Sequence, residues 1–185
     1  MKTPCTVRRA VESDLPAIND IYNYYVSRST CTYQEQPDTM DNRREWFGYH
    51  GEKHPVTVAS ENGQVVGWGS LSPFHERSAY QYTVENSLYI HHAHHRRGIG
   101  SLLLEDLIAR GRRLGHRVII AGIDGEQTAS VAIHAKFHFE KVGHFRRVGF
   151  KFGRWLDVIY MELDLQTGNG PPHEDKTAPP KTSAP

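Results

Sequence analysis

Apolar residues recur along this chain with two alternating spacings, one typical of helices and one typical of strands. Ile18 and Tyr25 recur at helical spacing behind Asp14, the expected N-cap, and predict a first helix. Shorter apolar runs bounded by turn residues predict strands, and two of these runs flank the favoured hairpin pair Asn62-Gly63. The expected helices span about residues 13–27, 40–50, 98–114 and 127–137, and the expected strands about 6–9, 56–60, 64–71, 80–90, 117–122, 142–148 and 155–165. Strands that alternate with helices favour an α/β fold with a mixed sheet.

Composition predicts one domain followed by a tail. Residues 1–166 carry all the periodic segments, whereas residues 167–185 are rich in Pro, Gly, Ser, Thr and charge and contain no large apolar residue. We therefore expect 167–185 to be a disordered tail that is dispensable for chemistry. A net charge of +1 excludes a strong general attraction to nucleic acid or membrane. Two cysteines, Cys5 and Cys31, are too few for a disulfide framework, and there is no N-terminal apolar run, so a cytoplasmic protein is expected.

The segment from Ser87 to Leu104 runs from strand through tight loop to helix and predicts a phosphate cradle. Gly98 and Gly100 allow a sharp turn and let backbone N–H groups converge on an anion, and the following helix adds its positive dipole end. No Gly-Lys-Ser/Thr closes the loop, and the three-glycine dinucleotide pattern is missing. ATP and NAD are therefore disfavoured as ligands.

This loop resembles the Arg/Gln-x-x-Gly-x-Gly/Ala loop of the GCN5-related N-acetyltransferases (GNAT), with His95 in place of the first Arg or Gln. The resemblance implies acetyl-CoA as cosubstrate and a central, mixed, mostly antiparallel, splayed β-sheet flanked by helices. It also implies that the pantetheine arm adds to the open strand edge through backbone hydrogen bonds. The residues expected to hold acetyl-CoA are Leu88, Tyr89, Ile90, Arg96, Arg97, Gly98, Ile99, Gly100, Ser101, Gln127, Ser130 and Lys136.

Four further blocks, at residues 82–87, 121–124, 130–134 and 148–157, resemble the phosphinothricin and methionine sulfoximine N-acetyltransferase branch of that superfamily. The resemblance implies an acceptor that is a small amino-acid-like amine, such as phosphinothricin, methionine sulfoximine or methionine sulfone, and a role in resistance to such compounds. It also implies a homodimer. Trp155, Trp46 and the group Tyr22, Tyr24 and Tyr25 offer apolar surface for it, although core packing explains these aromatics equally well.

Acetyl transfer to an amine needs a base, because an α-ammonium is mostly protonated at neutral pH. Glu85, at the start of the strand that leads into the cradle, stands where the branch has its catalytic carboxylate, and it is the expected base, directly or through a water. His134 stands on the helix after Asp124, where the wider superfamily has Tyr and this branch has His. We assign His134 to the active site, with its role as acid, base or hydrogen-bond donor left open.

Substrate binding is expected at Tyr33, His75, Arg77 and Glu85. An Arg guanidinium suits bidentate capture of the acceptor's carboxylate, and Arg77 lies in the loop before the catalytic strand, where the branch has basic residues. His75 falls where a second basic residue often stands. Tyr33 matches an aromatic wall of the branch's substrate pocket, although plain packing explains it equally well.

The chain departs from the branch at two places. Gln127 replaces the usual Asn that contacts the CoA arm, which changes the reach of the amide. His138 stands in Phe137-His138-Phe139 where a Gly usually provides a left-handed helix end, so the turn geometry there is open.

Three other interpretations compete with the enzyme. The cluster of His91, His92, His94 and His95 suggests a metal site, but no acidic or cysteine partner is near in sequence, and we expect no physiological metal. The basic run Arg110-Gly111-Arg112-Arg113 suggests nucleic-acid binding, against which the balanced charge argues. A catalytically silent acyl-CoA sensor would keep the glycine loop without needing Glu85. Within the enzyme hypothesis, another amine or amino acid is the alternative acceptor.

Overall fold

A computed structural model of the chain describes residues 5–165 and shows seven strands and four α-helices there. The strands are β1 (Thr6–Arg9), β2 (Val56–Glu61), β3 (Gln64–Pro73), β4 (Thr83–Ile90), β5 (Val118–Asp124), β6 (Glu140–Lys151) and β7 (Arg154–Asp164). The helices are α1 (Leu15–Val26), α2 (Met40–Gly48), α3 (Ile99–Arg113) and α4 (Thr128–Lys136), with short 3₁₀ turns at Glu12–Asp14, Ser78–Tyr80 and His92–His94. The predicted tail, residues 167–185, lies outside the described residues.

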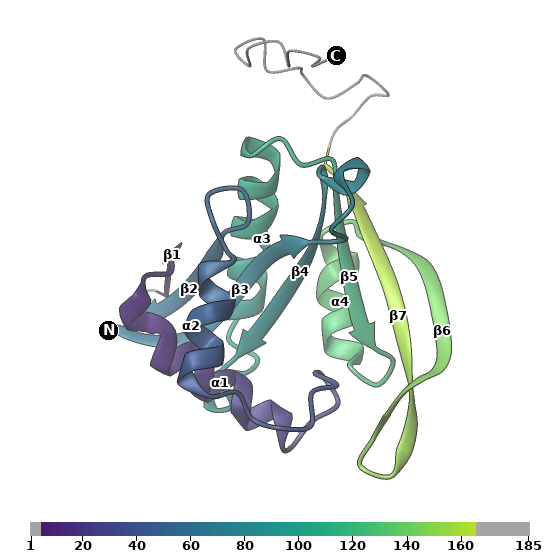
Figure 1. Ribbon diagram of the computed structural model, residues 1–185, viewed down its shortest axis with the longest axis horizontal. Coiled ribbons are helices and arrows are strands. Elements are labelled where there is room, and N and C mark those ends of the chain that lie inside the picture. Colours follow the sequence, from purple (N-terminus) through teal and green to yellow (C-terminus); the bar gives the residue numbers. More distant parts are fainter. Residues whose placement is uncertain (1–4, 166–185) are drawn as a thin grey trace, which may run out of the picture.

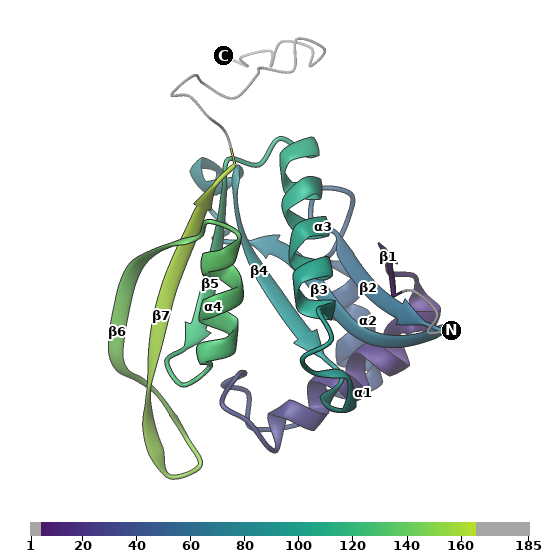
Figure 2. The same cartoon turned by 180° about the vertical axis from the view of Figure 1, so that it is seen from behind.

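The strands form one sheet in the order β1-β2-β3-β4-β5-β7-β6, and all neighbours are antiparallel except β4 and β5. Helices α1 and α2 cover one face of the sheet (Figure 1), and α3 and α4 cover the other (Figure 2). The predicted α/β fold with a mixed sheet is confirmed. No helix within residues 5–165 is long and apolar enough to cross a membrane.

The sheet splays between its two parallel strands. β4 and β5 pair only at their beginnings, where Thr83, Val84 and Glu85 lie opposite Val118–Ile120. After Glu85 the two strands diverge, so the second half of β4 has an open edge toward β5. We call the gap between the diverging strands the fork. It leaves room for a cavity within the sheet.

Apolar side chains pack on both faces of the sheet. Leu104 and Leu107 of α3 are fully buried against Val84 of β4 and Ile119 of β5, so one helix joins the two halves of the splayed sheet. On the other face, Ile18 of α1 belongs to a second buried cluster. Burying a side chain of this size contributes about 1.5–3 kcal/mol.

Local turn chemistry acts as the sequence predicts. Asn62 and Gly63 have φ values of 52° and 78°, the left-handed pair that the β2–β3 hairpin requires. Gly115, with a φ of 79°, ends α3. His138 adopts a φ of 66°, so the helix end after α4 is left-handed although it carries His instead of Gly.

One predicted strand start and one predicted helix cap are wrong. The strand expected from residue 80 begins at Thr83, because backbone bonds from Tyr80 N–H to Arg77 O and from Gln81 N–H to Ser78 O close a 3₁₀ turn first. Asp14 does not cap α1 with its side chain. Its carboxylate instead accepts from Val11 N–H at 2.9 Å and from Arg8 at 2.6 and 2.8 Å.

Candidate active site

A cavity of about 780 Å³ opens at the fork between β4 and β5. Side chains and backbone from β4, β5, β7, α3, α4 and the segment before α2 line it, so residues far apart in sequence meet there. Of the residues predicted to bind ligand, the cavity brings together Tyr33, Glu85, Leu88, Tyr89, Ile90, Arg96, Gly98, Ile99, Gly100, Ser101, Gln127, Ser130 and His134.

The glycine loop closes one end of this cavity. Arg96 and Gly98 have φ values of 56° and 82°, and this left-handed backbone precedes the first turn of α3, whose unpaired N–H groups suit an anion. A Cβ at Gly98 would meet nothing within 4 Å, so the space above the loop is open. A Cβ at Gly100 would lie 3.1 Å from Ile133 Cδ1, so the second glycine allows α3 and α4 to pack closely.

Side chains from α1 hold this loop in place. Tyr25 Oη lies 2.5 Å from His95 Nε2 and also donates to Ile90 O. His92 stacks on Tyr24 with ring centroids 3.9 Å apart. Two of the four clustered histidines, His92 and His95, thus pack against aromatic rings of α1.

Glu85 lies at the point where β4 leaves β5. Its Oε1 would be 3.1 Å from a Cβ at Gly122, and the Tyr160 ring flanks the same position, so the carboxylate and the Tyr160 side chain meet over this glycine. Burial raises the pKa of Glu85, and the nearby His75 opposes this. Burial and the Glu85 charge raise the pKa of Tyr160. A half-buried carboxyl with a raised pKa, in a cavity, is suited to accept a proton near neutral pH.

His134 projects from α4 on the opposite face of β4 and is buried, with 2% of its surface exposed. Its Nδ1 lies 2.8 Å from Ser130 O, and its Nε2 lies 3.0 Å from Asn86 Nδ2. Burial lowers the pKa of His134. The neutral imidazole is therefore the favoured form.

The segment before α2 forms an aromatic wall of the cavity. Tyr33 Oη lies 2.9 Å from Asp124 Oδ2 and 3.0 Å from Asp157 O, and it can donate its proton to either. Thr30 donates to the other oxygen of Asp124 at 2.9 Å. The Tyr33 ring lies directly on Gly149, where a Cβ would come within 2.4 Å of the ring. The wall is thus held by β5 and by the β6–β7 hairpin.

Two buried cations hold the same segment from outside the cavity. Lys151, 2% exposed, donates to Ser29 O at 2.9 Å and to Thr32 O at 2.7 Å. Arg43, also 2% exposed, pairs with Asp38 at 2.5 Å. These contacts tie both ends of the segment to the folded core.

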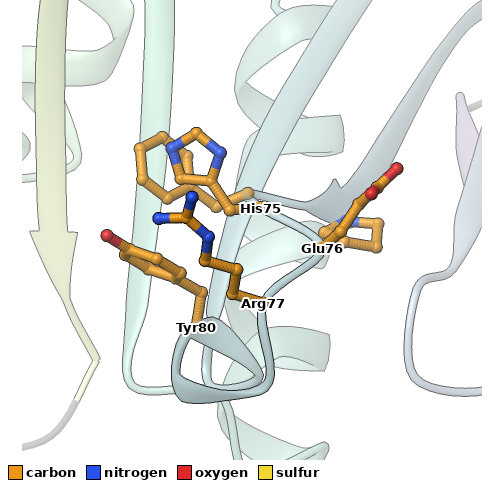
Figure 3. A pocket seen from close by; sticks show the side chains of 6 residues that line it. His75, Glu76, Arg77 and Tyr80 are labelled. Atoms are coloured by element: carbon orange, nitrogen blue, oxygen red, sulfur yellow. The ribbon is translucent and has the colours of Figure 1, made fainter.

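Arg77 and His75 line a second hollow of about 670 Å³, together with Pro73, Phe74, Glu76 and Tyr80. Figure 3 shows the side chains of His75, Arg77 and Tyr80 gathered on one side, while Glu76 points away. Pro73, at one end of this hollow, follows Ser72, which pairs with Glu85 across β3 and β4, and the charge of His75 acts to lower the pKa of Glu85. Arg77 makes no ion pair within residues 5–165 and is free to bind an anion.

Two residues predicted to bind acetyl-CoA lie away from the cavity lining. Arg97 donates to both oxygens of Glu61 at 2.8 and 3.0 Å, because β2 ends beside the glycine loop. Lys136 is exposed at the end of α4, with its Nζ 5.9 Å from the Phe137 ring centroid. Their assignment as ligand contacts stays a prediction.

Several residues that the fold brings to the cavity had no predicted role, and three of them carry polar side chains beside Glu85, His134 or Tyr33. Asn86, Asp124 and Tyr160 all line the cavity. Asp124 belongs to one of the sequence blocks that resemble the branch, but no role was predicted for it. The alternation of side chains along a strand could have placed Asn86 on the face of β4 that Glu85 does not occupy. Nothing local in the sequence marks Tyr160, because its position opposite Gly122 arises from the pairing of β5 with β7.

Known proteins resemble this chain over most of its length. A model of the acetyltransferase (GNAT) family matches residues 18–139. An L-methionine sulfoximine/L-methionine sulfone acetyltransferase of Salmonella typhimurium is 37% identical over 90% of this chain and 98% of its own. A phosphinothricin N-acetyltransferase of Streptomyces coelicolor is 38% identical over 86% of this chain and 95% of its own.

A solved structure shares the architecture closely. The GNAT superfamily phosphinothricin acetyltransferase of Sinorhizobium meliloti, in complex with acetyl-CoA, is 37% identical over 92% of this chain and 94% of its own, with a TM-score of 0.89. The splayed, mostly antiparallel sheet expected from the glycine loop is therefore confirmed as a fold.

Proposed function

The chain belongs to the acetyltransferase (GNAT) family, and from this premise we propose that it acetylates the α-amine of a small amino-acid-like acceptor, with Glu85 as the base. Membership makes it an acetyl-CoA-dependent N-acetyltransferase. One observation carries the finer proposal: a carboxyl with a raised pKa shares a cavity with the glycine loop. Arg77, which makes no ion pair within residues 5–165, lines a second hollow.

The residues at the fork fit acetyl-CoA. The open space above Gly98 and the N–H groups at the start of α3 suit a pyrophosphate. The unpaired edge of β4 at Leu88 and Ile90 suits the amides of the pantetheine arm. Acetyl-CoA would supply there the thioester whose acetyl group passes to the acceptor amine.

Glu85 then takes a proton from the acceptor's ammonium, directly or through a water. Its raised pKa brings it nearer to the operating pH, where a base is most effective. The Tyr160 ring packs beside the same glycine, Gly122, and so forms part of the cavity wall next to the carboxylate.

Arg77 would bind the acceptor's carboxylate, with His75 beside it. The hollow begins one residue after Ser72, the partner of Glu85 across β3 and β4, and this placement supports an acceptor that carries its carboxylate near its amine. Tyr33 on its Asp124 support would contact the acceptor's side chain. The names of the relatives support methionine sulfoximine, methionine sulfone and phosphinothricin as acceptors, which would make the enzyme a resistance factor.

Thiol release from acetyl-CoA tests this proposal. The full chain is assayed with methionine sulfoximine, methionine sulfone, phosphinothricin, free amino acids and polyamines. We expect saturable release with the first three, a loss of turnover in Glu85→Gln of about a hundredfold or more, and a raised acceptor KM in Arg77→Ala. Binding of acetyl-CoA without turnover on any acceptor would instead favour a sensor, and preference for polyamines would exclude the carboxylate site.

We also propose that the enzyme acts in the cytoplasm as a homodimer. Six apolar side chains on the β6–β7 hairpin are each more than half exposed: Val142, Phe145, Val148, Phe150, Phe152 and Trp155. Of the residues expected from sequence to form this surface, Trp155 is 63% exposed, whereas Trp46 and Tyr22 pack against the buried Trp68. A cluster of this kind favours burial against a second copy.

Light scattering during gel filtration measures this state. Trp155→Asp should shift the protein toward monomer. Tyr49→Asp, a change at a residue 76% exposed outside the hairpin, should not. Equal mass for all three proteins would remove the hairpin as the interface.

A further inference from the structure

The hydrogen bonds of His134 determine which of its nitrogens carries the proton. Nδ1 is 2.8 Å from the carbonyl oxygen of Ser130, and a carbonyl only accepts, so Nδ1 carries the hydrogen. Burial lowers the pKa of His134 and keeps the ring neutral, which leaves Nε2 as a bare lone pair. The edge of the ring toward β4 is therefore an acceptor.

Asn86 supplies the matching donor. Because Nε2 can only accept, the atom of Asn86 that faces it at 3.0 Å must be the amide nitrogen. The orientation of the Asn86 amide is thus fixed by His134. Its carbonyl oxygen, Oδ1, points elsewhere and is buried without a hydrogen-bond partner within residues 5–165.

An unpartnered buried carbonyl oxygen costs free energy unless a ligand satisfies it. Asn86 is 7% exposed and lines the cavity at the fork. It lies on the α4 side of β4, because neighbouring strand residues point to opposite faces and Glu85 faces the other side. The two residues therefore border the fork from both sides.

We propose that His134 is a positioning residue that accepts a hydrogen bond from Asn86, and that Asn86 Oδ1 accepts a hydrogen bond from an N–H group of the bound ligands. This inference deepens the proposed function and rests on it for the identity of the ligands. The N–H belongs either to an amide of the pantetheine arm or to the acceptor amine. In both cases His134 works through Asn86 and gives no proton to the leaving thiol.

Nitrogen-15 NMR of the ring tests the tautomer in the free protein, without any turnover. The His134 signals are identified by their absence from His134→Gln. We expect a protonated Nδ1 and an unprotonated Nε2 across neutral pH. In Asn86→Asp the facing carboxylate can only accept, so Nε2 should become protonated as well. An Nε2-protonated ring in the unaltered protein would overturn the proposal.

Kinetics of two matched variants separate positioning from acid catalysis. His134→Gln keeps an acceptor oxygen close to the place of Nε2 but has no titrating proton, whereas His134→Leu has neither. We expect His134→Gln to retain kcat within about fivefold and His134→Leu to lose about tenfold to a hundredfold. A general acid contributes about a hundredfold or more, so an equal, large loss in both folded variants would show that His134 donates a proton.

Asn86→Leu identifies the source of the N–H. Titration calorimetry with CoA alone reports on the pantetheine arm, and the acceptor KM and kcat report on the amine. Weaker CoA binding assigns the bond to pantetheine; unchanged CoA binding with a changed acceptor KM or kcat assigns it to the acceptor. No change in any of these would overturn the role of Oδ1. If no acceptor is turned over, the NMR still decides the tautomer and the CoA titration still decides the pantetheine contact, so failure of the proposed function is recognised separately.

Discussion

Replacing Gly149 with Ala should displace the aromatic wall of the cavity. Gly149 lies under the Tyr33 ring, and its φ is not in the left-handed region, so the backbone itself accepts Ala. A Cβ there would lie 2.4 Å from Tyr33 Cε2 and 2.6 Å from Cδ2, whereas ordinary contact begins at 3.4 Å. The ring must therefore move by about 1 Å for normal contact to be restored.

Such a movement affects both packing and hydrogen bonding. Overpacking of this kind costs about 1–3 kcal/mol. The Tyr33 hydroxyl is held 2.9 Å from the buried Asp124 carboxylate, and a hydrogen bond to a charged group is worth about 1.5–3 kcal/mol. Since the ring can relieve the clash partly at the expense of the bond, we expect a total loss of about 2–4 kcal/mol, or about 5–15 °C in Tm.

Urea and thermal unfolding measure this loss, and Gly143→Ala is the matched control. Gly143 lies on the same strand, where a Cβ would meet its nearest neighbour at an ordinary 3.7 Å. Gly149→Ala should also raise the acceptor KM while leaving acetyl-CoA binding unchanged, because only the wall is altered. In a Tyr33→Ala background the Gly149→Ala change should cost far less, since the clash is gone.

Two results would refute this reasoning. One is a stability of Gly149→Ala within about 0.5 kcal/mol of Gly143→Ala, which is the range of a neutral surface change. The other is an equal loss from Gly149→Ala with and without the Tyr33 ring.

Three further changes have definite expected outcomes. If Glu85 is the proposed base, it acts in its deprotonated form, and burial raises its pKa. The value of kcat/KM should therefore fall as pH drops through that raised value, and Glu85→Gln should abolish this limb of the pH profile. Gly98→Ala places a Cβ at a φ of 82° and should raise the acetyl-CoA KM and lower stability by about 1 kcal/mol, whereas Gly115→Ala, at a φ of 79° outside the loop, should lower stability alone. The hydrogen bond from Arg8 lowers the pKa of Asp14 in the folded protein, so its stabilisation is present above the unfolded pKa and is lost as pH falls through the folded one. Urea unfolding between pH 3 and 7, roughly the carboxyl range and above, should show Asp14→Asn less stable than the unaltered protein at neutral pH, with the difference vanishing in acid.

The sequence predicted those features whose cause is local. The hairpin at Asn62-Gly63, the helix end at Gly115 and the glycine loop depend on the conformations of single residues, and all three have the expected left-handed φ values. The alternating spacings of apolar residues also predicted the strands and helices in the right order. The start of β4 was predicted too early because a 3₁₀ turn competes locally with an extended chain of similar composition.

Contacts between distant segments could not be predicted in this way. Tyr33 meets Gly149 and Asn86 meets His134 only because of how the sheet and helices pack. Arg97 was expected to bind phosphate from its place beside the glycines, and its pairing with Glu61 depends on where β2 ends. Family resemblance named Glu85 and His134, but the donor and acceptor at each nitrogen of His134 came from the structure.

The segment between α1 and α2 is held at both ends, so its side chains can vary while its backbone path is kept. Lys151 binds its carbonyl groups at Ser29 and Thr32, and Arg43 grips Asp38 near its other end. Backbone carbonyls are offered by every residue type, so the first anchor is indifferent to the side chains it holds. Substitutions between the anchors that spare Thr30 and Tyr33, whose hydroxyl groups bind Asp124, should therefore reshape this wall of the cavity and leave the rest of the fold unchanged.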